Sequence, residues 1–336
     1  LSKSSSKIFK PVEPGDNILM ASSDTDYVFG RKMDRTKITT IYFRNKKENI
    51  GEDAWDVSEK KNGSIMAWTE EKRDGFKDLY LAANGNILAN KDCSSLFKEY
   101  RNLKKFVGLQ YFRTNQTENM ENMFSSCESL ASLDVSHFDT SHVTNMSSMF
   151  SWCESLASLD VSHFDTSHVT NMLFMFSSCE SLASLDVSHF DTSHVTDMYS
   201  MFAYCGSLAS LDVSHFDTSQ VTDMRLMFAY CGSLASLDVS HFDTSQVTNM
   251  SKMFSSCASL ASLDVSHFNT SQVSNMQDMF NECKSLKILD VSNFDTSNVK
   301  DLSVSLAEYF AVPKGVRLKI KKANGFFNKL WEKLSN

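Results

Sequence analysis

The chain has 336 residues, of which 42% are hydrophobic and 22% charged, and its formal net charge is −8. This much apolar sequence can bury a continuous core, and the acidic balance argues against nucleic acid as a partner. No stretch is apolar for long enough to span a bilayer, so we expect no transmembrane segment in this fragment. Because the sequence opens on Leu1 and shows no signal peptide, we expect a trimmed or mature chain.

Two segments precede the most regular part of the sequence. Residues 1–37 are polar, and we expect a linker or a loosely wrapped segment there. Residues 38–92 alternate apolar runs with glycine-containing turns, which predicts a β-rich N-terminal cap. The expected strands and turns are Ile38–Phe43, Ser64–Thr69 and Asp78–Ala83, with turns at Asp74-Gly75 and Asn84-Gly85.

Between Cys127 and Cys283 the sequence repeats with a period of 26, and the region that we expect to stack extends over residues 93–302. The repeated phrase is SLASLDVSHFDTSHVTNMxxMFxxC, and a degenerate first copy contains Leu96, Phe97, Leu103 and Phe106. Its cysteine recurs at Cys127, Cys153, Cys179, Cys205, Cys231, Cys257 and Cys283. A fixed period of this size predicts a solenoid, in which each repeat forms one coil that buries its apolar face only against its neighbours.

The copy from Leu130 to Cys153 shows the local structure that we expect in a coil. Leu133 to Ser136 alternates apolar and polar residues, which predicts a short strand. Asp139 to Ser141 supplies turn residues, and the apolar residues that follow, spaced by three and four, predict a short helix. Thr144 is its expected N-cap. The predicted fold class is therefore α/β, with a short strand and a short helix in each coil.

Residues 303–336 are expected to form a C-terminal cap that contains a strand and a helix. The strand is predicted at Val316–Lys321. The helix is predicted from an apolar stripe that comprises Phe326, Phe327, Leu330, Trp331 and Leu334.

Two parts of the repeated phrase carry a resemblance to a known family. LxxLxVxxF resembles the strand segment of leucine-rich repeats, and LDVSxFDTSxVTNMxxMFxxC resembles the 26-residue repeat of the BspA-like leucine-rich-repeat family of bacterial surface proteins. The resemblance extends from about Phe112 to Leu302, and the segment before it also resembles the cap of such proteins. It implies a leucine-rich-repeat-like solenoid at the cell surface or in the extracellular space, used for adhesion.

The cysteines are expected to be buried free thiols. One cysteine in each 26 residues fits no zinc motif, because zinc sites need pairs of ligands two to four residues apart. Each cysteine ends a stripe of Val, Met and Phe, where a thiol acts as a small apolar side chain. Disulfides between adjacent coils are the alternative, although they would strain a regular stack. We expect no metal and no cofactor.

Stacking turns each position of the repeat into a column of equivalent residues. The aspartates of LDVS are expected on the concave face, either as a strip that binds cations or amines or as solvated groups that the neighbouring serines satisfy. A histidine column runs beside them, with transition-metal binding or acid response as its functional reading and solvation as the alternative. The two columns are Asp134, Asp160, Asp186, Asp212, Asp238 and Asp264, and His137, His163, His189, His215, His241 and His267.

The aspartates of FDTS form a separate column. Asn269 replaces aspartate in one copy, which keeps the acceptor oxygen and loses the charge. The property common to this column is therefore a turn-capping hydrogen bond, and we predict a structural role for it.

Specificity is expected where the repeats differ, just after the first Met and just before the cysteine. Aromatic residues and arginine are common interface anchors, so these windows predict an exposed outer ridge. Variation at unconstrained positions, with aromatic rings that cover neighbouring coils, is the alternative. The ridge comprises Trp152, Phe174, Tyr199, Tyr204, Arg225 and Tyr230.

Three functions remain open from the sequence. The first is a non-enzymatic surface protein that adheres to a host surface or matrix protein or to a glycan. The second is a structural spacer or stalk of a larger surface protein, and the third is a cation-responsive surface module. Identical copies of Asp, His and Ser on every coil argue against catalysis, which needs one unique preorganised pocket.

Overall fold

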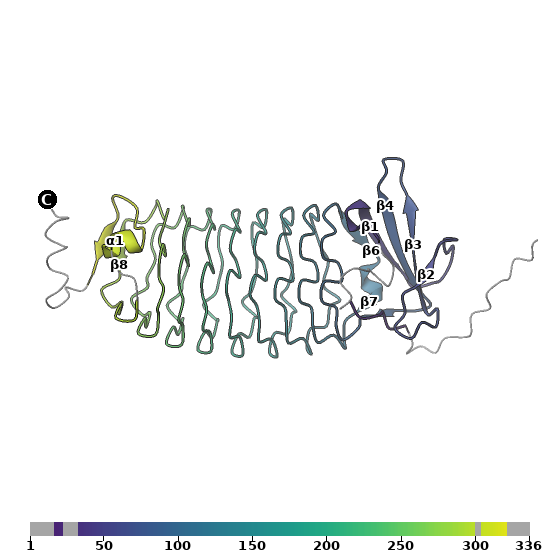
Figure 1. Ribbon diagram of the computed structural model, residues 1–336, viewed down its shortest axis with the longest axis horizontal. Coiled ribbons are helices and arrows are strands. Elements are labelled where there is room, and N and C mark those ends of the chain that lie inside the picture. The colour runs from purple at the N-terminus through teal and green to yellow at the C-terminus, as the bar shows by residue number, and fades with distance from the viewer. Residues whose placement is uncertain (1–16, 23–32, 300–303, 321–336) are drawn as a thin grey trace, which may run out of the picture.

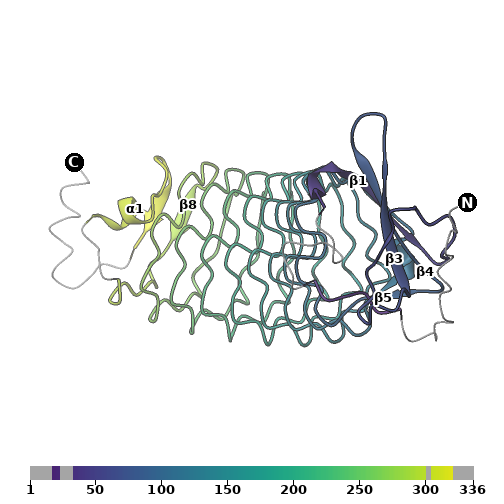
Figure 2. The ribbon, with the colours of Figure 1, turned by 45° about the vertical axis from the view of Figure 1, so that its right-hand side comes forward.

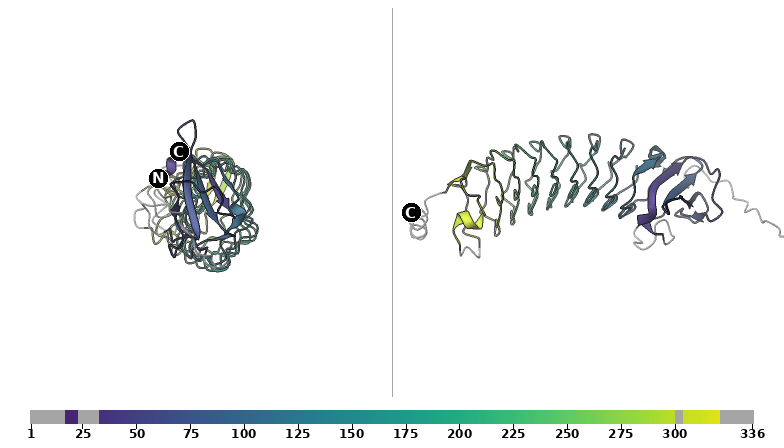
Figure 3. Two further views of the ribbon diagram at one scale, coloured as in Figure 1. Left: turned by 90° about the vertical axis from the view of Figure 1, so that its right-hand side faces the viewer. Right: turned by 90° about the horizontal axis from the view of Figure 1, so that it is seen from above.

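The computed structural model describes residues 17–22, 33–299 and 304–320. The chain forms an elongated row of stacked coils, with a sheet at the N-terminal end and α1 (Leu306–Tyr309) at the other (Figure 1). Figure 2 shows the coils as successive parallel loops. Seen along the row the coils superpose, and seen from above the row bends gently (Figure 3). The tandem repeats therefore form a solenoid-like stack.

The N-terminal sheet contains the three strands predicted from the sequence. β3 and β4 form an antiparallel hairpin, whereas β1 pairs in parallel with both β4 and β6. In spatial order its strands are β2 (Trp55–Asp56), β3 (Ile65–Glu71), β4 (Lys77–Ala83), β1 (Ile38–Arg44) and β6 (Lys105–Val107). In the segment expected to be a linker, Leu19 is buried and bridges to Ser58.

Short elements connect this sheet to the first coils. A parallel pair, β5 and β7, continues the chain into the stack. Gly108 precedes η2 with a φ of 77°, a left-handed conformation that glycine adopts without steric cost. The bounds are η1 (Arg35–Lys37), β5 (Ile87–Leu88), η2 (Leu109–Tyr111) and β7 (Phe112–Arg113).

The predicted helix of each coil is wrong. Residues 146–153 form consecutive tight turns instead, in which an amide bonds to the carbonyl three residues before it, as from Met149 to Met146 (3.2 Å). Every second amide donates instead to the next coil, as Phe150 does to Met175 (3.0 Å). Ser148 and Trp152 have left-handed φ values of 54° and 60°, which no α-helix tolerates. The apolar spacing of three and four therefore reflects stacked turns.

The strand predicted at LDVS is a regular strand only in the last coil. There β8 (Ile288–Asp290) pairs in parallel with β9 (Arg317–Lys319). In the other coils the bridges form mainly nine residues after the serine of LDVS, as between Asn145 and Asn171. Thr144 caps no helix, since its amide and its hydroxyl both donate to the Glu118 carbonyl of the preceding coil.

The core runs continuously through the stack. Phe150, Phe176, Phe202 and Phe228 are fully buried, and neighbouring rings stack with centroids 5.7–5.8 Å apart. A buried threonine column reinforces the stack, because each hydroxyl donates to a carbonyl of the next coil, as Thr218 does to Asp243 (2.9 Å). Loss of such a bond would leave the buried threonine hydroxyl or its carbonyl without this partner, so the Phe and Thr columns both hold the coils in register.

The cysteines are free and buried, as predicted. Each thiol of the repeats donates to a phenylalanine carbonyl of the preceding coil, as Cys205 does to Phe176 (3.2 Å). Burial raises the pKa of Cys153 and of Cys205 to about 12. These thiols are therefore protonated, and they are unreactive because the thiolate is the reactive form. They serve as small side chains of the core.

The C-terminal end is closed by α1 and the residue that follows it. A capping box between Ser305 and Glu308 starts the helix. Phe310 is buried and contacts the rings of Phe280 and Phe294. β9 lies within the strand predicted near this end. The predicted helical stripe from 326 to 334 lies outside the described residues.

Candidate functional site

The structure divides the predicted aromatic ridge into two groups. Phe174, Tyr199 and Arg225 are each half-buried, and they contact one another. The rings of Phe174 and Tyr199 meet edge-on at 4.6 Å, and the Arg225 guanidinium lies 4.4 Å from the Tyr199 ring. Arg225 also makes a bidentate ion pair with Asp223. Tyr199 therefore contacts both Phe174 and Arg225, and the three side chains cover the surface of neighbouring coils.

The other group is exposed, and we call Trp152, Tyr204 and Tyr230 the aromatic strip. Their exposed fractions are 51%, 43% and 38%. The two tyrosine rings stack on each other with centroids 4.2 Å apart and planes 6° apart. Large apolar side chains with this much exposure in one column make the aromatic strip a candidate interaction surface.

All three residues of the aromatic strip have left-handed backbone conformations. Ser178 and Ser256 occupy the same column with the same conformation, so the coil itself imposes it. Ser178 lies between Trp152 and Tyr204 and is only 3% exposed, which indicates that the neighbouring side chains shield it. Bulky residues rarely adopt a left-handed φ. Backbone preference therefore does not account for Trp and Tyr at these positions.

The LDVS aspartates are exposed, and each caps its own turn. The Ser136 amide donates to Asp134 (3.0 Å), and the same bond recurs along the column, as from Ser188 to Asp186 (3.0 Å). The FDTS column makes the same bond, and Asn269 makes it without a charge (3.1 Å). The predicted capping role of the FDTS column is therefore confirmed, and the structure gives the LDVS column the same role.

These hydrogen bonds predict acid sensitivity. The serine hydroxyl and amide lower the pKa of Asp134, Asp186 and Asp212 below the usual value for aspartate, which is about 3.9 in unfolded chains. A pKa that is lower in the folded state stabilises the fold above the unfolded pKa, and this stabilisation is lost as pH falls through the folded pKa. We expect the melting temperature to fall as pH drops below about 4, as thermal melts at a series of pH values would show.

Asparagine provides the control for this prediction. An Asp186→Asn, Asp212→Asn, Asp238→Asn variant keeps the acceptor oxygens and removes the titrating groups. Its melting temperature should fall less steeply over the same pH range. Parallel curves for the two proteins would contradict the assignment of acid sensitivity to these carboxyls.

The six histidines of the predicted column are all exposed. Five of them lie within hydrogen-bond distance of the preceding serine hydroxyl, as His189 Nδ1 does of Ser188 (3.0 Å). His163 instead donates from Nε2 to the Val135 carbonyl (2.8 Å). Within residues 17–22, 33–299 and 304–320, no group of three or more His, Cys, Asp or Glu side chains has a metal-binding arrangement.

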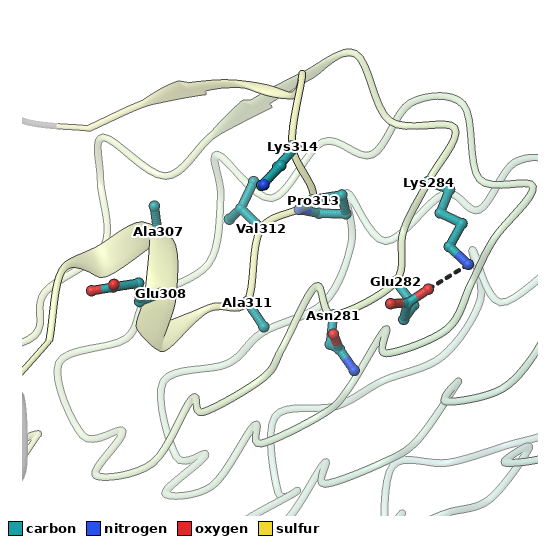
Figure 4. A pocket seen from close by; sticks show the side chains of 9 residues that line it. All are labelled: Asn281, Glu282, Lys284, Ala307, Glu308, Ala311, Val312, Pro313 and Lys314. Atoms are coloured by element: carbon teal, nitrogen blue, oxygen red, sulfur yellow. Dashed lines mark ion pairs between the residues drawn. The ribbon is translucent and has the colours of Figure 1, made fainter. Parts of the chain in front are cut away.

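A pocket of about 550 Å³ lies between the last coil and α1 (Figure 4). Glu282 forms an ion pair with Lys284 at its rim (2.5 Å), and Glu308 is held by its capping box. Glu282, Lys284 and Glu308 therefore already have partners, and the described residues that line the pocket include no Ser, Thr, Cys or His. Its lining residues are Asn281, Glu282, Lys284, Ala307, Glu308, Ala311, Val312, Pro313 and Lys314.

Two sets of residues near these surfaces were missed in the sequence. Asp197 and Asp223 replace asparagine in adjacent coils. Burial is the main cause that raises the pKa of Asp197, and repulsion from Asp223 adds to it. Gly206 and Gly232 each follow a tyrosine of the aromatic strip by two residues. The signal for both sets was a change of residue type within a column, which is visible when the copies are aligned.

Among the described residues, no helix has the length and apolar content needed to cross a bilayer.

The comparisons with known proteins identify a family of repeat proteins. No curated protein and no solved structure matches the chain. A family model matches in two successive copies, over residues 91–210 and 207–313, which together exceed half of the chain. The chain therefore belongs to the repeat family described as Mycoplasma protein of unknown function, DUF285.

Proposed function

We propose that this chain is a non-enzymatic cell-surface or extracellular protein that adheres to a host surface or matrix protein or to a glycan through the aromatic strip. The observation that carries the proposal is the exposure of Trp152, Tyr204 and Tyr230 in one column of a regular stack. Aromatic anchors of this kind contribute much of the binding energy at interfaces. The resemblance to BspA-like leucine-rich repeats supports adhesion and a surface location.

The repeated polar residues support a non-enzymatic role. Asp, Ser and His recur on successive coils, and each LDVS aspartate accepts the same bond from the amide of the serine two residues on. A catalytic group needs a unique environment that shifts its reactivity. Repetition instead suits a surface that offers equivalent contacts along its length.

The test measures binding of the whole chain to an array of matrix proteins and mucosal glycans. We expect a Trp152→Ala, Tyr204→Ala, Tyr230→Ala variant to bind at least about tenfold more weakly, because truncated anchor residues typically cost more than about 1–2 kcal/mol each. The variant should fold, since its mutated side chains lie outside the core, and melting curves verify that it does.

The matched control replaces three exposed polar residues of another column of the stack. A Gln220→Ala, Gln246→Ala, Gln272→Ala variant removes as many side chains and is expected to bind like the original chain. Equal binding by the aromatic-strip variant would exclude the strip as the site. A folded original chain that binds nothing on the array would favour the spacer function.

A further inference from the structure

The residue that follows each cysteine changes type beside the two tyrosines of the aromatic strip. In the N-terminal coils this position holds Glu128, Glu154 and Glu180, and next to the two tyrosines it holds Gly206 and Gly232. Burial is the main cause that raises the pKa of Glu154, and repulsion from Glu128 and Glu180 adds to it, while Glu128 itself pairs with Arg101. The glutamate column ends at Glu180, whose carbonyl accepts from the Ser207 amide of the next coil (3.1 Å).

Neither glycine is required by the backbone or by packing. Neither has a positive φ, and a Cβ on Gly232 would meet no atom within 4 Å. A Cβ on Gly206 would approach only the Tyr230 carbonyl oxygen, at 4.0 Å. The Gly206 carbonyl accepts from the Ser233 amide (3.2 Å), just as the Glu128 carbonyl accepts from Ser155 (3.1 Å). What glycine supplies here is therefore open surface beside the tyrosines.

The exposed residues next to these glycines are small and uncharged. The coils that hold Gly206, Gly232 and Ala258 continue from this position with an exposed Ser, a buried Leu and an exposed Ala-Ser pair. We call the exposed residues the serine terrace, and they are Ser207, Ala209, Ser210, Ser233, Ala235, Ser236, Ser259, Ala261 and Ser262. No apolar side chain in the terrace is larger than alanine, and none of its members is charged.

We propose that the serine terrace, together with Tyr204 and Tyr230, binds a neutral oligosaccharide. A sugar ring has an apolar C–H face that packs on an aromatic ring, and its hydroxyls both donate and accept, as serine hydroxyls do. An anionic sugar would find no basic residue within the terrace to pair with, since the lysines of these columns, Lys284 and Lys287, lie in the coil beyond it. A protein partner would find no large aliphatic side chain beyond the rings. This inference rests on the proposed adhesive function and names the ligand class of the same site.

The test titrates the whole chain with neutral cello-, malto- and galacto-oligosaccharides, and with heparin and sialyllactose as anionic probes. We expect binding to at least one neutral oligosaccharide and to neither anionic probe. A Gly206→Glu, Gly232→Glu variant restores the side chain that the N-terminal coils carry, and so it should fold. We expect it to bind at least about tenfold more weakly, because the added side chains cover the sugar site.

The matched control adds the same charge elsewhere. An Ala131→Glu, Ala157→Glu variant places two glutamates at exposed positions of the N-terminal coils, and its affinity should stay within about twofold of the original. Equal weakening in both variants would show a general charge effect and overturn the terrace as the site, and so would unchanged binding in the glycine variant.

Failure of this inference is distinguishable from failure of the proposed function. Binding to proteins or anionic sugars alone, lost in the aromatic-strip variant, would overturn the ligand class and leave adhesion in place. No binding to any protein or sugar would overturn both.

Discussion

Replacement of Phe202 with alanine is expected to lower the free energy of unfolding by about 3–5 kcal/mol. The ring is fully buried, and it stacks between Phe176 and Phe228 at 5.7 and 5.8 Å. In a solenoid each coil contacts only its two neighbours. A cavity at Phe202 therefore also weakens the interface that joins the coils before it to the coils after it. We therefore expect the variant to unfold at lower urea concentration and over a broader transition.

Urea titration followed by circular dichroism measures this change. The control is Gln220→Ala, which removes an exposed side chain nearby and should change stability by less than about 0.5 kcal/mol. Similar midpoints for the two variants would show that the Phe column does not hold the coils together.

The second large effect is expected from Gly108→Ala, at the junction of the N-terminal sheet and the stack. Gly108 has a φ of 77°, and a Cβ there would lie 2.2 Å from the Phe43 carbonyl oxygen. That oxygen belongs to the backbone of β1, so the clash is relieved only by displacing a buried strand. We expect a loss of more than about 3 kcal/mol, since the left-handed conformation alone costs an alanine about 1 kcal/mol.

Gly75→Ala separates the two contributions. Gly75 also has a left-handed φ, of 80°, but a Cβ there meets no atom within 4 Å. This variant should therefore lose only about 1 kcal/mol, and thermal melts of both proteins give the difference. Equal melting temperatures for the two variants would contradict the close approach between Gly108 and β1.

The sequence predicted the cap strands, the stacking period and the buried cysteines, because each depends on a local pattern. Alternation of apolar residues sets a strand such as β3, and the recurrence of Cys127 and its equivalents sets the coil. The capping role of the FDTS aspartates also followed from the sequence, since Asn269 retains only the acceptor oxygen.

The helix prediction was wrong because the same spacing arises in two ways. Apolar residues at Met146, Met149, Phe150 and Cys153 mark one face of a helix, or of consecutive turns with a left-handed residue at every fourth position. What decides between them is where the amides bond, and half of them bond to the next coil. That contact is long-range, and the pattern of one repeat does not contain it.

The candidate site was predicted only in part for a related reason. The windows before the cysteine gave Trp152, Tyr204 and Tyr230, but composition did not separate them from Phe174, Tyr199 and Arg225. The separation comes from contacts between side chains on adjacent coils, such as the Arg225 guanidinium over the Tyr199 ring. Whether either group binds a partner stays a prediction.

The central claim is that each coil consists of turns and inter-coil bonds, because this geometry places the aromatic strip on the surface. Far-ultraviolet circular dichroism of the whole chain tests it most directly. The structure predicts that the coils contribute no α-helical signal, so the helical ellipticity should not exceed what the four-residue α1 and the helix predicted at 326–334 supply. A strong helical spectrum, as a helix in every coil would give, would contradict the turn structure and the position of the strip with it.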